Sequence, residues 1–555
     1  MKPVILALSL VMLSFACGVE ETTPPTAISV TLTPHAANAH IGESVQFTAT
    51  VRNSTNKAVI WSLSGAGCSG STCGTISITG LYAAPASVPS PATVTVRATS
   101  AADSSKSASA TIIVLEAAIN EWTWVSGSDL GNQGGVYGTK GMADPSNVPG
   151  ARELAVSCVD AASKFWLFGG WGADSAGNGG DLNDLWKYDP ETLMWTWMSG
   201  DSVRDQIGVY GTKGTADPSN VPGAREMATI WLDSNDKLWL FGGSGLDAAG
   251  DQGWLNDLWK YDPTTLEWTW MSGSNTVFQA GVYGTKGTAD PSNVPGARDR
   301  AVSCTDSSGR LWLFGGEGLD SVGYYNDLND LWRYDPVTLE WTWVSGSNNG
   351  EQSGIYGTKG MANPSNVPGG REMPVLRIDS SDNLWLFGGM GIDSVGYSGY
   401  LNDLWKFAPA TLQWTWVSGS NTAYQAGIYG TKGTADPSNV PGARALAVFW
   451  IDSLGEFWLF GGEGEISGSA GGKLNDLWNY DPNTFEWTWV SGSDTTYQPG
   501  VYGIKGIADP SNVPGSRYGA VSWIDSGSNL WLFGGAGIDS THHEGLLNDL
   551  WRYFR

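Results

Sequence analysis

The sequence predicts an all-β protein in which a small β-sandwich precedes an array of six repeats. Three observations support this prediction. Alternating polar and apolar segments separated by turn residues fill residues 27–116. From residue 118 onward the same motifs recur every 73 residues, six times, with no insertion or deletion. The 555-residue chain has 75 glycines and 30 tryptophans but only 15% charged residues, a composition typical of short aromatic-rich strands joined by tight turns.

The first 26 residues predict export rather than a folded element. One lysine precedes an apolar run from Val4 to Phe15, which is too short and wrongly flanked for a membrane span, so residues 1–16 are interpreted as a signal peptide. The stretch "SFAC" at 14–17 resembles the lipobox of bacterial lipoproteins, with Ser14 where that family usually has leucine. The resemblance implies a lipid on Cys17, a linker over 17–26 and, with Gly18 next, an outer-membrane or cell-surface location. Ordinary cleavage and secretion is the alternative.

Residues 27–116 contain about six alternating strands joined by Gly, Asn, Ser and Pro turns, which predicts a β-sandwich. This region resembles bacterial Ig-like modules, and the resemblance implies a spacer with Trp61 in its core. Cys68 and Cys73 bracket a short Gly/Ser loop, so we expect a disulfide between them in an oxidising compartment.

Four strands are expected in each 73-residue copy, as the second copy illustrates: 224–232, 238–243, 255–261 and 267–273. Turns rich in Asp, Asn and Pro separate the first strand from the second and the third from the fourth. One arginine begins every copy: Arg152, Arg225, Arg298, Arg371, Arg444 and Arg517.

The motif "PGAR…LWLFGG…LNDLWKYDPTTLEWTW" resembles the kelch repeat, over residues 118–555. The resemblance implies a six-bladed kelch β-propeller, similar to galactose oxidase, in which each blade has four strands. Kelch units have ~50 residues, so each copy here is about 23 residues longer. The repeated tryptophans are expected to pack neighbouring blades together.

The chain ends at "LNDLWRYFR" without the "WTW" segment that follows this motif elsewhere, whereas "EWTW" at 121–124 has no such motif before it. We therefore expect the strand at 121–127 to pair with 547–553 and close the ring, which removes two open sheet edges.

The long connections of such blades lie on one face. The connection from the fourth strand to the next copy barely varies and is expected to be an ordered crown. The connection after "FGG" differs in every copy, which suits recognition by variable loops on a rigid scaffold; loops that vary because nothing constrains them are the alternative. The candidate binding residues are Trp171, Trp254, Phe278, Tyr324, Tyr325, Tyr397, Tyr400, Tyr424, Tyr497, His542 and His543.

Two further sets recur in register. An acidic set in the variable loops could bind a cation through oxygen ligands, although we expect each aspartate to cap its own turn: Asp174, Asp247, Asp320, Asp393 and Asp539. Cys158 and Cys304 occupy equivalent positions in alternate copies, where the expected ~15 Å separation, from sheets ~10 Å apart, is too long for a disulfide. We expect both to be free, buried thiols.

A net charge of −25 argues against nucleic-acid binding. The galactose-oxidase resemblance implies a copper site of His and Tyr, but His35 and His40 precede the repeats and only the adjacent His542 and His543 remain. We therefore expect no cofactor. We expect a non-enzymatic, surface-anchored protein that binds a glycan or protein partner through the long-loop face and contacts the membrane only through its lipid. A secreted carbohydrate-active enzyme, hydrolase or oxidase-like, is the alternative from another class, and a structural surface-layer component is a third.

Overall fold

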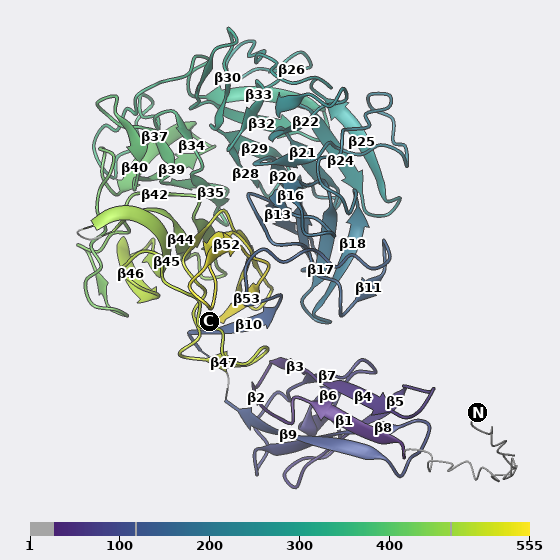
Figure 1. Ribbon diagram of the computed structural model, residues 1–555. Coiled ribbons are helices and arrows are strands. Elements are labelled where there is room, and N and C mark those ends of the chain that lie inside the picture. Colours follow the sequence, from purple (N-terminus) through teal and green to yellow (C-terminus); the bar gives the residue numbers. More distant parts are fainter. Residues whose placement is uncertain (1–26, 117–118, 467–468) are drawn as a thin grey trace, which may run out of the picture. The chain divides into compact units, whose positions relative to one another are not determined.

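The computed structural model describes residues 27–116, 119–466 and 469–555 (Figure 1). The all-β prediction is confirmed for these residues, which form strands, turns and one 3-10 turn. Contacts divide them into two compact units, one of residues 27–38 and 44–114, the other of residues 39–43 and 115–555. The predicted signal peptide, Cys17 and the linker 17–26 lie outside the described residues. No helix among the described residues is long and apolar enough to cross a membrane.

The first unit has three small sheets with the strand orders β1-β4, β2-β9-β8-β5 and β3-β7-β6. Its buried centre includes Phe47, Tyr82 and Val96. Trp61, the expected core residue, is only half-buried and covers Gly80. Cys68 and Cys73 are joined in a disulfide. The elements are β1 (Ser29–Thr33), β2 (Ala36–His40), β3 (Ser44–Gln46), β4 (Thr48–Arg52), β5 (Val59–Ser64), η1 (Gly70–Cys73), β6 (Thr75–Ile76), β7 (Leu81–Ala83), β8 (Thr93–Ser100) and β9 (Ser107–Leu115).

The second unit contains six antiparallel sheets with the same internal order, here called the repeated sheets. From inner to outer strand, the first three are β13 (Val156–Val159), β14 (Phe165–Phe168), β17 (Leu185–Asp189), β18 (Met194–Ser199) and β11 (Ala143–Asp144); β20 (Thr229–Leu232), β21 (Leu238–Phe241), β24 (Leu258–Asp262) and β25 (Glu267–Ser272); and β28 (Val302–Thr305), β29 (Leu311–Phe314), β32 (Leu331–Asp335), β33 (Glu340–Ser345) and β26 (Ala289–Asp290).

The other three repeated sheets follow the same order. They are β35 (Val375–Ile378), β36 (Leu384–Phe387), β39 (Leu404–Ala408) and β40 (Gln413–Ser418); β43 (Val448–Ile451), β44 (Phe457–Ile466), β45 (Ser469–Asp481), β46 (Glu486–Ser491) and β41 (Ala435–Asp436); and β49 (Val521–Ile524), β50 (Leu530–Phe533), β53 (Leu550–Phe554), β10 (Glu121–Ser126) and β47 (Ala508–Asp509).

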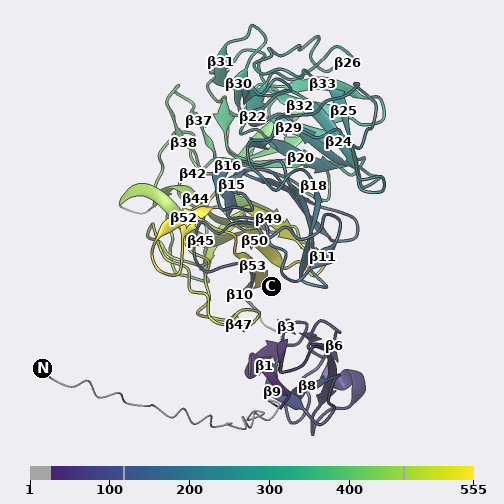
Figure 2. The same ribbon diagram turned by 45° about the vertical axis from the view of Figure 1, so that its right-hand side comes forward.

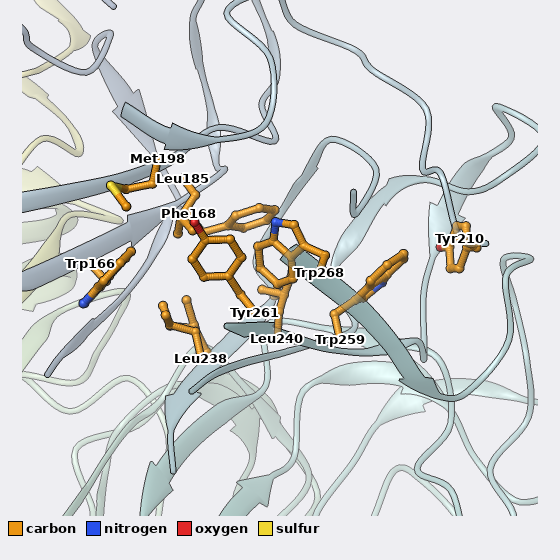
Figure 3. Packing of buried hydrophobic residues seen from close by; sticks show 12 residues of the cluster. Trp166, Phe168, Leu185, Met198, Tyr210, Leu238, Leu240, Trp259, Tyr261 and Trp268 are labelled. Atoms are coloured by element: carbon orange, nitrogen blue, oxygen red, sulfur yellow. The ribbon is translucent and has the colours of Figure 1, made fainter. Parts of the chain in front are cut away.

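The second strand of five repeated sheets is buried at every position, as in β21, and so are the first six residues of the longer β44, because neighbouring sheets cover both faces of the strand. Figure 3 shows one such contact, where Phe168 and Leu185 of the first repeated sheet meet Tyr261 and Trp268 of the second. The rings of Phe168 and Trp268 lie 5.8 Å apart, edge to face. The repeated tryptophans therefore hold adjacent sheets together.

The six inner strands contact one another in a cycle, in which β13 contacts both β20 and β49. Figure 1 labels β13, β20, β28 and β35 of this set, and Figure 2 labels β20 and β49. A ring of backbone hydrogen bonds follows the same cycle. The residue two positions after each repeat arginine donates its N–H to the carbonyl of its counterpart in the preceding copy, over 2.8–3.2 Å. All six have positive φ, from 53° to 64°, and the last bond, from Leu154 to Gly519, closes the ring: Leu154, Met227, Arg300, Met373, Leu446 and Gly519.

The sixth repeated sheet combines both ends of the second unit. β10 pairs antiparallel with β53, with Trp122 opposite Tyr553 and Trp124 opposite Trp551. Its other edge pairs with β47, and Trp122 is 1% exposed. An N-terminal strand thus supplies the outer strand that the C-terminal repeat lacks.

The long connection between copies differs from the expected crown, because part of it lies along the outer edge of the next sheet. Its Ala-Asp segment forms β11, β26, β41 or β47 and pairs there with the fourth strand. In the second copy, Tyr210 donates to Asp257 Oδ2 over 2.6 Å and Lys213 donates to the carbonyl of Gly273 over 2.7 Å. This connection shields a strand edge that would otherwise be open.

Each repeat arginine forms a fully buried ion pair within its own copy. Arg225 donates through both terminal nitrogens to Asp257, at 2.7 and 2.8 Å, and this carboxylate also accepts from Tyr210 and Trp259. The same arrangement recurs six times, in Arg152–Asp184, Arg225–Asp257, Arg298–Asp330, Arg371–Asp403, Arg444–Asp476 and Arg517–Asp549. These arginines are structural, because every one already has its counterion.

The expected first strand, 224–232 in the second copy, is in fact two strands. The positive φ of Met227 separates β19 (Arg225–Glu226) from the inner strand β20. β19 joins a second kind of sheet, here called a hairpin sheet, because the variable connection after "FGG" folds into a β-hairpin rather than a loop.

The hairpin sheets are β12 (Arg152–Glu153), β15 (Trp171–Ala173) and β16 (Gly179–Asp181); β19, β22 (Ser244–Leu246) and β23 (Gln252–Trp254); β27 (Arg298–Asp299), β30 (Glu317–Leu319) and β31 (Tyr325–Asp327); β34 (Arg371–Glu372), β37 (Met390–Ile392) and β38 (Ser398–Tyr400); and β48 (Arg517–Tyr518), β51 (Ala536–Ile538) and β52 (Glu544–Leu546). In the fifth copy β42 (Arg444–Ala445) pairs directly with the long strand β44.

Candidate functional site

The hairpin sheets surround one end of the central channel, here called the channel mouth. The mouth is a cavity of about 150 Å³ lined by the six residues of the backbone ring and by the start of the inner strands. Five of the six ring residues are Leu154, Met227, Met373, Leu446 and Gly519, and the remaining one is Arg300. Arg300 is thus the one charged side chain of this ring.

Arg300 is held by acidic side chains from two hairpin sheets. Its guanidinium donates to Glu317 and, over 2.7 Å, to Glu372 Oε2 of the next copy. Asp299 Oδ2 lies 3.8 Å from its Nε. Asp299 is 3% exposed, and its Oδ1 has no hydrogen-bond partner within the described chain. One cation thus faces three carboxylates.

Further carboxylates lie near Arg300, around the mouth rather than among the residues that line its cavity. Burial, followed by the charges of Asp181 and Glu153, raises the pKa of Glu226 to about 7. Burial also raises the pKa of Asp299 to about 7, with Arg300 opposing the shift. The pKa of Asp327 rises to about 7 through burial and Glu372. These carboxyl groups therefore take up protons near neutral pH, unlike ordinary surface carboxylates.

Three of the predicted binding residues come together beside this acidic group. The rings of Trp254 and Tyr325 stack at 4.4 Å with an angle of 11° between their planes. Phe278 meets Trp254 edge to face at 5.7 Å. The hydroxyl of Tyr325 donates to Glu317, which also pairs with Arg300. Phe278 and Tyr325 are each about half exposed, so the cluster presents aromatic surface to solvent.

The other predicted aromatic residues are distributed around the face. Tyr400 and Tyr424 form an edge-to-face pair at 6.2 Å in the fourth copy. Tyr497 covers Gly472, as Phe278 covers Gly253 and Tyr424 covers Gly399, so these three rings also hold their connections against the hairpins. Trp171 is 40% exposed and packs over Gly179 of its own hairpin.

The remaining candidates lie at hairpin tips. Tyr324 and Tyr397 are 70% and 72% exposed. His542 has a positive φ, and the ring of His543 is hydrogen-bonded to Thr541. The structure does not bring these four residues into the aromatic cluster at Trp254.

The recurrent aspartates of the hairpins cap their own turns. Asp393 Oδ1 accepts the N–H groups of Val395 and Tyr397, both at 2.9 Å. Equivalent bonds occur in the other copies, at Asp174, Asp247, Asp320 and Asp539. Over residues 27–116, 119–466 and 469–555 no group of three or more His, Cys, Asp or Glu side chains is arranged to hold a metal ion.

Cys158 and Cys304 are free thiols, but they are half-buried rather than buried as expected. Both lie on inner strands, β13 and β28, and their side chains pack against the hydrophobic clusters between neighbouring sheets. Burial raises the pKa of each thiol. These thiols are therefore poor nucleophiles at neutral pH.

Sequence reasoning missed Asp181, Glu226, Asp299, Arg300, Glu317, Asp327 and Glu372. The signal was present in the register, because the position after each repeat arginine is acidic in four copies: Glu153, Glu226, Asp299 and Glu372. The next position is charged only at Arg300. Arg300 is thus the one charged residue in a series of otherwise uncharged equivalents, and the acidic positions precede members of that series. Only the fold shows that these positions from different copies meet at the mouth.

No protein-family model and no curated protein matches the chain. Among solved structures, it is similar to YjhT, with 15% identity and a TM-score of 0.44, covering 73% of this chain and 95% of that one. It is also similar to a fungal alcohol oxidase of the AA5 family in complex with copper, with 13% identity, a TM-score of 0.39 and 76% of each chain covered. A third similarity, to an endo-arabinase from Bacteroides thetaiotaomicron, has 12% identity and a TM-score of 0.29, covering 62% of this chain and 96% of that one.

Proposed function

We propose that the chain is a non-enzymatic, extracellular or surface-anchored binding protein whose channel mouth recognises a glycan. In this proposal the six repeated sheets are the blades of a kelch-type β-propeller, supported by the closed cycle of inner strands. The first unit is an Ig-like spacer, and a lipid on Cys17 holds the protein at the bacterial outer membrane or cell surface. A protein partner on the same face is the other occupant that the sequence allows.

One observation carries the proposal. The partly exposed cluster of Trp254, Phe278 and Tyr325 adjoins carboxylates, since Tyr325 donates to Glu317, whose side chain is 16% exposed and can accept further hydrogen bonds. Aromatic rings stack on the C–H faces of sugars, while carboxylates accept hydrogen bonds from their hydroxyl groups. Carboxylates outnumber Arg300, so the mouth favours neutral or amine-bearing sugars over acidic ones.

A glycan array with the mature chain tests this function. We expect binding to neutral or amine-bearing glycans, with at least tenfold weaker binding in Trp254→Ala and Tyr325→Ala, because one aromatic contact contributes about 1.4 kcal/mol or more. Phe485→Ala is the matched control, since Phe485 is an exposed aromatic residue in the turn between β45 and β46. Binding confined to acidic glycans, or no glycan binding together with capture of a protein on this face, would refute the glycan proposal.

A carbohydrate-active enzyme is the second candidate, and the raised pKa values of Glu226, Asp299 and Asp327 favour it. A carboxyl group protonated near neutral pH can act as a general acid at a glycosidic bond, with a second carboxylate as base or nucleophile. Turnover of a glycan by the mature chain that is lost in Asp299→Asn, while Phe485→Ala retains it, would establish this interpretation. Binding without turnover would reject it.

A further inference from the structure

A second feature of the central channel adjoins the mouth and shares lining residues with it, among them Val156, Ala301 and Pro374. The channel encloses a cavity of about 200 Å³ lined by the inner strands of all six repeated sheets. A bound water needs ~10–15 Å³ of such volume, so the cavity has room for a small ion together with several waters. Four of these strands, β13, β20, β28 and β35, are labelled around the ring in Figure 1.

Arg377 of β35 brings a positive charge into this cavity. At the equivalent position other copies have Trp231, Trp450 and Trp523, or Cys158 and Cys304. Each of the three tryptophans donates its indole N–H to a carbonyl of another sheet. Arg377 departs from this pattern, since its side chain lines the cavity and its Nη2 lies 3.5 Å from the hydroxyl of Ser522, on β49.

The guanidinium of Arg377 has no counterion. No carboxylate in the described ranges lies within ion-pair distance of it, whereas every repeat arginine has an aspartate. Asp379, two residues further on, is already bonded to Ser381, Asn383 and Trp385. Apart from the long contact to Ser522, Arg377 makes one hydrogen bond, to the carbonyl of Leu376. Most of its five N–H donors are therefore unused.

Hydroxyl groups surround this charge. Ser157, Ser303 and Ser522 line the same cavity and come from the first, third and sixth repeated sheets. The first and sixth sheets are neighbours, and the Ser157 hydroxyl already donates to the carbonyl of Ser522 over 3.3 Å. Arg377 is half-buried, and an unpaired cation that is partly removed from water is stabilised by an anion or a strong acceptor beside it. Burial lowers the pKa of Arg377, with the nearby thiol of Cys304 as the smaller, opposing influence. An anion with several oxygen atoms would neutralise the charge of Arg377 and accept hydrogen bonds from its unused N–H groups. The planar guanidinium binds two oxygens at once, and the hydroxyls can donate to others.

We propose that the central channel holds a small oxyanion, bound by the Arg377 guanidinium and the hydroxyls of Ser522 and Ser303. The site adjoins the mouth and is opposite in charge to the carboxylates around that mouth. It takes phosphate, sulfate or a small carboxylate, which share the geometry that the guanidinium recognises. Because Arg377 breaks the repeat in one copy only, the expected stoichiometry is one anion per chain.

Isothermal titration calorimetry of the mature chain at constant ionic strength tests the site, with separate arms for inorganic phosphate, sulfate and acetate. We expect saturable binding of one anion per chain in at least one arm. Arg377→Gln and Arg377→Trp should each weaken it at least tenfold, and the second variant introduces the residue type that three other copies tolerate at this position. Ser522→Ala should weaken binding less.

Arg333→Gln is the matched control, because it removes one arginine charge from β32, where Arg333 lies over the ring of Trp312. Its anion affinity should equal that of the unmodified chain. The proposal is overturned if the unmodified chain shows no saturable binding in any arm, or if Arg377→Trp binds as tightly as the unmodified chain. Thermal denaturation of each variant establishes that it is folded before titration.

Discussion

Arg298 and Arg300 are two residues apart, yet they belong to opposite kinds of environment. Arg298 is completely buried and bonded to Asp330, in an arrangement found in all six copies. Arg300 is partly exposed, shared among three carboxylates of two copies, and found in one copy only. The contrast indicates that the repeated arginines are paired one to one inside each copy, whereas the arginine that breaks the repeat is paired across two copies at the partly exposed mouth.

The largest effect expected from this contrast concerns closure of the scaffold. Deleting residues 118–127 removes β10, including the buried Trp122, and exposes the edges of β53 and β47. We expect a loss of well over ~3–5 kcal/mol of unfolding free energy, the usual cost of removing one large buried aromatic side chain. Denaturant unfolding checks it. Deleting residues 27–114 is the control and should cost far less; an equal loss would mean that β10 does not close the ring.

The two arginines provide the next test. Arg298→Ala leaves Asp330 as an unpaired buried charge and should cost about 3–5 kcal/mol of unfolding free energy. Arg300→Ala should cost about 1 kcal/mol or less, because the ion pairs of Arg300 are partly solvated and the removed cation leaves carboxylates that can take up protons. Parallel denaturant curves at pH 7 give both values. Similar costs for the two variants would remove the distinction between scaffold and mouth.

Two tyrosines of the fourth copy extend the same contrast to neutral side chains. Tyr356 donates to the buried carboxylate of Asp403 over 2.6 Å, whereas Tyr397 is 72% exposed at a hairpin tip. Tyr356→Phe should lower the unfolding free energy by about 1.5–3 kcal/mol, the range for a hydrogen bond to a charged group. Tyr397→Phe should change it by less than about 0.5 kcal/mol. Thermal and denaturant unfolding of the two Tyr→Phe variants measure both losses of unfolding free energy. A substantial loss in Tyr397→Phe would show that the hairpin tips contribute to the stability of the scaffold.

The smallest expected effect depends on pH. The pKa of Asp299 is about 7 in the folded chain, above its ordinary value of 3.8, so the folded state binds more protons between these values and loses stability as pH rises through this window. Asp299→Asn cannot ionise, and its stability relative to the unmodified chain should increase by at least about 1–2 kcal/mol between pH 4 and pH 8. Denaturant unfolding across this pH range measures the change. Asp494→Asn, at an exposed position, is the control. A difference that stays constant with pH would show that Asp299 ionises normally.

Much of the scaffold was predictable, because it depends on residues that every copy repeats. The period of 73 residues, the tight turns and the apolar second strand identify four of the strands in each copy. The split of the first strand at Met227 was not predictable, since a methionine with positive φ carries no sequence signal and is imposed by the hydrogen-bonded ring at the channel mouth. The hairpin after "FGG" was missed because its residues vary too much to show alternation.

The aromatic part of the candidate site was predictable residue by residue, but its arrangement was not. Trp254, Phe278 and Tyr325 could be nominated because they are aromatic residues in variable connections. Their grouping could not, because Trp254 and Tyr325 belong to successive copies and meet only across the gap between two hairpins. Tyr324, next to Tyr325 in the sequence, lies outside the cluster.

The repeating scaffold of this protein follows from its sequence alone, since hydrophobic periodicity, turn residues and strand edges are local properties that each copy specifies again. Which charges remain unsatisfied was decided only when the copies packed together. Asp299, Arg300, Glu372 and Arg377 acquire their environments from neighbours one or more copies away, and burial in a ring of sheets controls both their pKa values and their available hydrogen bonds.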